Sequence, residues 1–73
     1  MNTIYVLYGG SSVDGRGYAD YHGFTEDIRE AVDFARKENS PYSIGYVERL
    51  SNYPYKEKRR LMFSQLLKEP LEL

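Results

Sequence analysis

The chain has 73 residues, enough for one domain, with one histidine and no cysteine. Disulfides and zinc sites of the common Cys/His type are therefore excluded, which leaves an efficient core or homo-oligomerisation as the source of stability. Ten Lys and Arg residues against eleven Asp and Glu residues give a net charge of −1, which fits neither a non-specific nucleic-acid binder nor an acidic mimic of DNA.

Residues 3–8 are β-branched, aromatic or leucine throughout, a composition typical of a strand. Apolar side chains occupy both sets of alternating positions, which indicates a central strand. The apolar run is too short to span a bilayer and lacks a basic leader, so we expect a soluble, cytoplasmic protein without a membrane partner. Segment 9–17, GGSSVDGRG, is predicted to be a loop, and residues 18–24 favour a second strand that completes a hairpin.

A helix is predicted over residues 26–38. Thr25 is a favourable N-cap, and the acidic residues that follow it suit the positive end of the helix dipole. The helix is expected to end at residues 39–41, Asn-Ser-Pro. Its apolar residues recur at i, i+3, i+4 and i+7 and form one stripe, made of Ile28, Ala31, Val32 and Ala35.

Residues 42–50 are predicted to form a third strand, after which Pro54 is well placed to open a second helix. Pro70 would end that helix and leave residues 68–73 as a tail. The expected fold class is α+β: a single domain over residues 1–73 with ββαβα order, a three-stranded, mostly antiparallel sheet and two helices. The crossover helix would return the chain beside the first strand and make that strand central.

The glycine-rich loop is a candidate anion site. Its backbone N–H groups can form a nest, with serine hydroxyls and one arginine as further donors. The spacing matches neither the Walker motif nor the dinucleotide fingerprint, and the alternative is a plain hairpin connection. The predicted ligand-binding residues are Gly9, Gly10, Ser11, Ser12 and Arg16.

His22, with nearby serines and aspartates, nominally supplies a hydrolytic triad. A triad is defined by geometry, however, and the sequence has no G-x-S-x-G nucleophile elbow. We therefore interpret His22 as a half-exposed residue at a sheet edge. The sequence predicts no catalytic residue, no cofactor and no metal site, and the protein is not expected to be an enzyme.

Eight tyrosines and a basic run at residues 56–60 are the strongest binding signals. Tyrosine joins a large ring to a hydroxyl at low entropic cost, and a sheet with helices on one face leaves its other face for such residues. The basic run would fall in the first turns of the second predicted helix, where cations are disfavoured, and this can mark contact with an acidic protein surface. It can equally be a solvated segment, and nucleic acid is the least favoured partner. The predicted interface residues are Tyr5, Tyr18, Tyr21, Tyr53, Tyr55, Arg59 and Arg60.

Three segments together carry a resemblance. They are GRGYADYHGFT, a helix of the pattern T-E-D-x-x-x-A-x-x-F-A, and a strand of the pattern Y-x-I-x-Y-V-E. The chain resembles small bacteriophage-encoded proteins of the host-takeover and anti-defence type over about residues 4–50. That resemblance implies a protein acting in the host cytoplasm that blocks a host enzyme or an immune effector, or sequesters an immune nucleotide. It assigns no functional residue.

Two hypotheses follow. In the first, the chain is a non-catalytic inhibitor that docks on a host or defence protein through its tyrosines and basic run. In the second, a homo-oligomer sequesters a small anionic ligand such as a cyclic nucleotide, with Arg16 in the loop and Arg59 and Arg60 supplied by a neighbouring copy. The balanced charge favours the first hypothesis, because nucleotide capture needs more cations around the loop.

Overall fold

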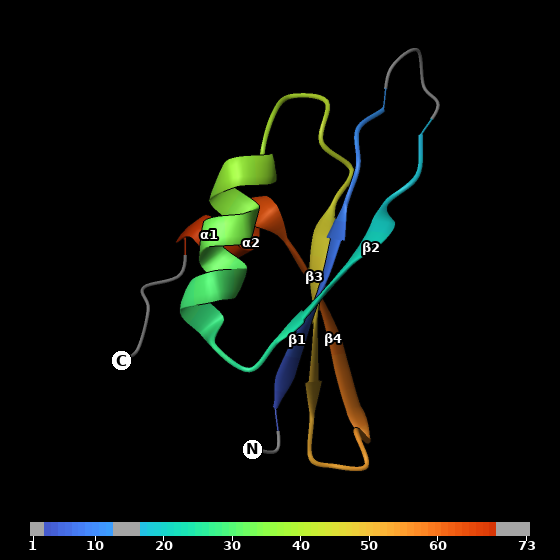
Figure 1. The fold of residues 1–73 in the computed structure, drawn as a ribbon, viewed down its shortest axis with the longest axis vertical. Coiled ribbons are helices and arrows are strands. Elements are labelled where there is room, and N and C mark those ends of the chain that lie inside the picture. Colours follow the sequence, from blue (N-terminus) through green and yellow to red (C-terminus); the bar gives the residue numbers. More distant parts are fainter. Residues whose placement is uncertain (1–2, 13–16, 69–73) are drawn as a thin grey trace.

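The computed structural model describes residues 3–12 and 17–68, which fold into one sheet and two helices. The four strands are antiparallel and lie in the order β2-β1-β3-β4, with both helices on one side of the sheet (Figure 1). The α+β class is confirmed, and β1 is central as expected. In chain order the elements are β1 (Ile4–Gly9), β2 (Asp20–Thr25), α1 (Ile28–Glu38), β3 (Tyr46–Ser51), β4 (Glu57–Met62) and α2 (Phe63–Lys68).

The sheet has a fourth strand, so the predicted three-stranded ββαβα arrangement is wrong in that detail. The helix expected from Pro54 is replaced by a turn, in which the N–H of Tyr55 donates to the Asn52 carbonyl oxygen at 2.9 Å, and then by β4. Leu61 and Met62, which lie within the predicted helix, point to opposite sides of β4, with 3% and 44% of their surfaces exposed. The basic run hides this strand, because its charges interrupt the alternation of apolar and polar residues.

The ladder between β1 and β3 continues beyond both strands. Residues 10–12 follow β1 and pair with residues 42–44 in the register that joins the two strands. The Ser12 N–H donates to the Tyr42 carbonyl oxygen at 2.8 Å. This end of the sheet therefore extends past the helices as an arm (Figure 1). The predicted strand at 42–50 corresponds to the paired residues 42–44 and to β3, which begins at Tyr46.

The core lies between the sheet and the two helices. The predicted stripe of α1 is confirmed: three of its four residues are buried, and Ile28 packs against them. Two of the stripe residues are alanines, which let the helix approach the sheet closely. None of the described helices is long and apolar enough to cross a membrane. The buried core residues are Ala31, Val32, Ala35, Val47, Leu61, Phe63 and Leu66.

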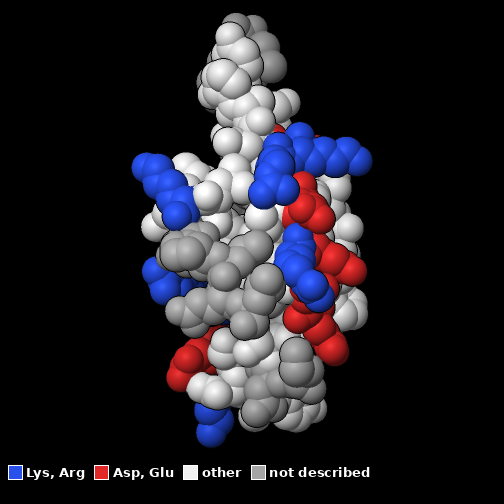
Figure 2. Space-filling view, turned by 90° about the vertical axis from the view of Figure 1, so that its left-hand side faces the viewer, with Lys and Arg blue, Asp and Glu red and all other residues white. Residues whose placement is uncertain are grey.

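The side of the molecule that carries the helices has mixed charge. Figure 2 shows Lys and Arg side chains lying among Asp and Glu side chains on this side. One such pair joins Arg36 Nη1 to Asp33 Oδ1 at 3.2 Å on the outer surface of α1. An exposed pair of this kind contributes little stability. Among the described residues, the helix side therefore has no patch of a single charge sign.

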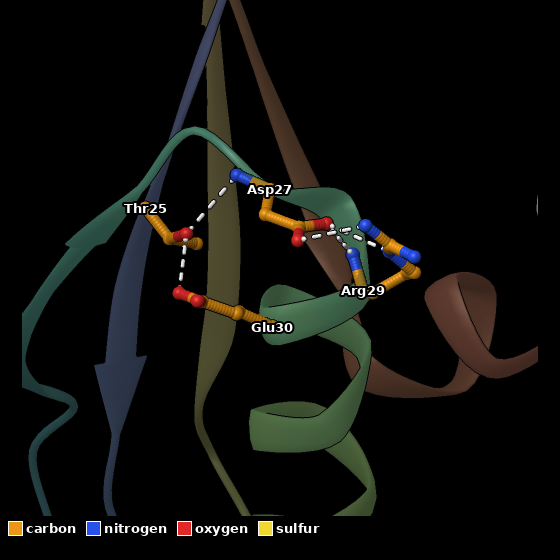
Figure 3. A network of polar contacts seen from close by, with 4 residues as sticks. All are labelled: Thr25, Asp27, Arg29 and Glu30. Carbon is orange, nitrogen blue, oxygen red and sulfur yellow. Dashed lines mark hydrogen bonds and ion pairs between the residues drawn. The ribbon is translucent and has the colours of Figure 1, made fainter. Parts of the chain in front are cut away.

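The start of α1 lies two residues later than predicted, and its N-cap is Asp27 rather than Thr25. Asp27 Oδ1 accepts from the backbone N–H of Arg29 at 2.8 Å. Thr25 Oγ1 accepts from the Asp27 N–H at 3.0 Å and donates to Glu30 Oε2 at 2.6 Å (Figure 3). Thr25 thus ties the end of β2 to the first turn of the helix, and the expected end of the helix at residues 39–41 is confirmed. The predicted tail at 68–73 lies, apart from Lys68, outside the described residues.

The Asp27 cap makes the free energy of unfolding depend on pH. The backbone N–H and the guanidinium of Arg29 hold the pKa of Asp27 below its ordinary value. The stabilisation is therefore fully present above about pH 4, where an unfolded chain has lost this proton, and disappears as the pH falls through the lower folded-state pKa. Asp27→Asn keeps a capping oxygen without the charge, so thermal unfolding from neutral to acidic pH should show a shallower loss of Tm. An unchanged acid slope would contradict this role.

The strand assignment of β4 predicts opposite effects at neighbouring positions. Leu61→Ala empties a site between the sheet and the helices and should lower the free energy of unfolding by about 2–5 kcal/mol. Met62→Ala removes a side chain that points away from the helices and should cost less than about 1 kcal/mol. Urea unfolding of both variants measures the difference. Equal losses would contradict the alternation.

Candidate functional site

The sheet face opposite the helices is the candidate site. Side chains alternate along a strand, and Leu7, Val47 and Leu61 pack against the helices, so their strand neighbours point the other way. A register shift in β2 places both Tyr21 and Phe24 on this second face. None of the described helices covers it (Figure 1). We call it the open face and define it by Ile4, Val6, Tyr8, Tyr21, Phe24, Tyr46, Glu48, Leu50, Lys58, Arg60 and Met62.

A row of three tyrosines and one arginine crosses the open face, with one residue from each strand. The Tyr21 and Tyr8 rings meet edge to face, with centroids 6.2 Å apart. The Tyr8 and Tyr46 rings are stacked, with centroids 4.7 Å apart and planes 23° from parallel. Arg60 completes the row, with its Cζ 4.1 Å from the centroid of the Tyr46 ring. We call these four residues the tyrosine row.

The contacts within the tyrosine row cover the faces of the Tyr46 ring. Because β3 lies between β1 and β4, Tyr8 and Arg60 cover opposite faces of the Tyr46 ring. Tyr8 and Tyr46 are half-buried, whereas Tyr21 and Phe24 at the β2 edge are 62% and 61% exposed. The row therefore presents a preformed surface whose central rings are already ordered by their neighbours.

A buried carboxylate lies beside the row. Glu48 is only 9% exposed, and its Oε2 lies 3.7 Å from Lys58 Nζ. Partial burial raises the pKa of the Tyr8 hydroxyl, and the negative charge of Glu48 raises it further. The nearby Arg60 acts in the opposite direction as a smaller influence. Tyr8 is thus held in its neutral, hydrogen-bonding form.

Both edges of the sheet are guarded against strand addition. β4 carries Glu57 and three cations along its exposed edge, and β2 is irregular where its register shifts opposite residues 7 and 8 of β1. Charges and bulges are the usual means by which edge strands avoid pairing with another chain. The open face is consequently a better contact surface than either edge.

Part of the glycine-rich loop has glycine for a steric reason. A Cβ at Gly10 would collide with the carbonyl oxygen of Tyr18, so the close approach of the two arms of the hairpin requires glycine there. The Ser12 N–H, a possible donor to an anion, is already bonded to Tyr42. Arg16 lies outside the described residues. Anion binding by this loop stays a prediction.

The predicted interface residues are dispersed. Tyr5 packs against the core on the helix side, and Tyr53 and Tyr55 contact each other in the β3–β4 turn, with centroids 5.4 Å apart. Tyr18 is exposed beside the arm. Arg59 points to the helix side.

Of the predicted set, only Tyr21 and Arg60 lie on the open face. Tyr8 and Tyr46, which join them into a row, were not selected from the sequence. The signal that could have found them is the alternating direction of side chains along β1 and β3, once it is known which face the helices cover.

His22 has a packing role in the structure. Its ring lies 5.4 Å from that of Phe34 on the helix side, and it is exposed. Its Nε2 would lie 3.0 Å from a Cβ added at Gly9, so it packs closely over the end of β1. Among the described residues, no cluster of three or more His, Asp or Glu side chains has the arrangement of a metal site.

The raised pKa of Tyr8 is directly testable. In a pH titration followed by NMR of labelled tyrosine rings, Tyr8 should be less ionised than a free tyrosine, which is half ionised at about pH 10. Stability should fall as the pH rises above that value, because the unfolded chain then releases the proton more readily. Glu48→Gln removes the second cause and should lower the pKa of Tyr8. A Tyr8 pKa insensitive to this substitution would contradict the proposed coupling.

The chain matches no known protein family, no curated protein and no solved structure. Its function has to be inferred from the geometry and charge of the open face.

Proposed function

We propose that the chain is a non-catalytic protein-binding module that docks on its partner through the open face. The observation that carries this proposal is the tyrosine row, in which an arginine and three tyrosines are ordered on a face that no described helix covers. Tyrosine and arginine are enriched at the positions that dominate protein interfaces. Their mutual stacking also lowers the entropy that binding has to remove, since the central rings are fixed beforehand.

Protein is favoured over single-stranded nucleic acid as the partner. Sheets that bind single strands offer aromatic ring faces on which bases stack. Both faces of Tyr46 are already covered by Tyr8 and Arg60, so stacking a base there would require breaking the row. The net charge of −1 also provides no general attraction for phosphate.

The resemblance to small bacteriophage proteins supports a specific class of partner. We propose a host enzyme or a bacterial defence protein, which the chain inhibits by occupying its surface. A surface that works by occupation needs affinity and shape but no catalytic group. The tyrosine row provides such a surface, because its polar groups are hydroxyls and a guanidinium around a largely apolar face.

Two consecutive arginines provide the test. Arg60→Glu reverses a charge on the open face, whereas Arg59→Glu makes the same change on the helix side of the same strand. In a quantitative pull-down from bacterial lysate, proteins captured by the wild type should fall at least about tenfold with Arg60→Glu and persist with Arg59→Glu, as expected for a central arginine. Urea unfolding of both variants controls for loss of fold. Retention of every partner by Arg60→Glu would refute docking through this face.

A further inference from the structure

We infer that the partner places a carboxylate over the β4 edge of the open face and an apolar side chain over the β2 edge. This inference rests on the proposed protein-binding function and specifies its chemistry. It also means that the occupant of the open face is a different, acidic protein and not a second copy of this chain.

The open face is chemically asymmetric. Its β2 edge presents Tyr21 and Phe24, which are exposed and uncharged. Its β4 edge presents Lys58, with 65% of its side chain exposed, and Arg60. A partner that matches both edges needs an apolar group at one end and negative charge at the other.

The carboxylate that the face itself contains is already engaged. Glu48 is buried and pairs with Lys58, and it balances one of the two cations. Among the described residues Arg60 forms no ion pair, and its guanidinium lies over the Tyr46 ring. Stacking on a ring leaves the edge of a guanidinium free to bind a carboxylate through two parallel hydrogen bonds. Arg60 is therefore held in position with its donors available.

A second copy matches this face poorly. A closed dimer would place the open face against itself, so that two copies of Lys58 and Arg60 met around two Glu48 side chains that are already buried. The interface would enclose two uncompensated positive charges, and burying an unpaired charge is costly. Docking of a different surface of a second copy would produce rings or open-ended chains rather than a closed dimer.

The sheet fixes the separation of the two anchors. Three strand spacings separate β2 from β4, which is about 14 Å at the usual distance between neighbouring strands. A helix lying across the strands covers that distance in about nine residues. The structure thus specifies a partner element with an acidic side chain and an apolar side chain about 14 Å apart.

The probe for this inference is a random copolymer of glutamate and tyrosine, compared with a matched copolymer of lysine and tyrosine and with an oligothymidylate. Binding is followed by backbone NMR of the intact chain. We expect the glutamate copolymer to shift signals of the open face. Its affinity should drop about tenfold with Arg60→Glu, hold with Arg59→Glu, and weaken as NaCl rises from about 50 to about 500 mM.

Several outcomes would overturn the inference. Equal or stronger binding of the lysine copolymer or the oligothymidylate to the open face would show that the carboxylate is not the recognised group. A closed dimer seen by light scattering, dissociated by Arg60→Glu but not by Arg59→Glu, would identify a second copy as the occupant. Failure of the glutamate copolymer to bind would also count against an acidic partner.

The two proposals fail in different ways. Arg60→Glu could abolish capture of the lysate proteins while Arg60→Gln retains them and the wild type still holds them from about 50 to about 500 mM NaCl. In that case docking through the open face stands and the acidic partner is refuted. If those proteins are unaffected by Arg60→Glu, the proposed function itself is refuted. Arg60→Lys separates charge from geometry, since it keeps the charge but loses the planar fork.

Discussion

A slip of one residue between β1 and β3 would put Tyr8 and Tyr46 on opposite faces of the sheet, because side chains alternate with a period of two. The register of this ladder therefore decides both what packs under α1 and what the protein displays. It is strongly specified, since the same slip would turn either Leu7 or Val47 away from the helices. The continuation of the pairing into residues 10–12 and 42–44 extends the ladder and strengthens that choice. The core and the candidate site are thus two consequences of one pairing.

The sequence predicted what depends on a long, regular apolar pattern. The stripe of α1 could be inferred from its helical period, and the central position of β1 could be inferred from apolar residues at both sets of alternating positions. Both are present in the structure. β4 could not, since its charged residues supply no apolar alternation and Leu61 alone points into the core. The predicted N-cap, Thr25, lies two residues before the observed one, Asp27. Both residue types are good caps, but Thr25 belongs to the end of β2.

The candidate site was harder to predict than the fold because composition does not distinguish faces. Arg59 and Arg60 are consecutive and chemically identical, and a helix at this position would have kept them on neighbouring parts of one surface. In a strand they separate completely, one toward the helices and one over the Tyr46 ring. The same alternation separates Tyr5, which packs on the core, from Tyr8, which joins the row.

The open face combines two properties that usually oppose each other. A small domain needs its large side chains for stability, whereas a binding surface needs them accessible. Here the stacked rings and the engaged Glu48 form a second packed layer, in which Val6 is buried although it lies outside the cluster that packs against the helices. Side chains in this layer stabilise one another and still present ring edges, hydroxyls and one guanidinium. Binding can then use groups that folding has already ordered, so the interface loses little entropy and its arginine keeps the geometry that a carboxylate requires.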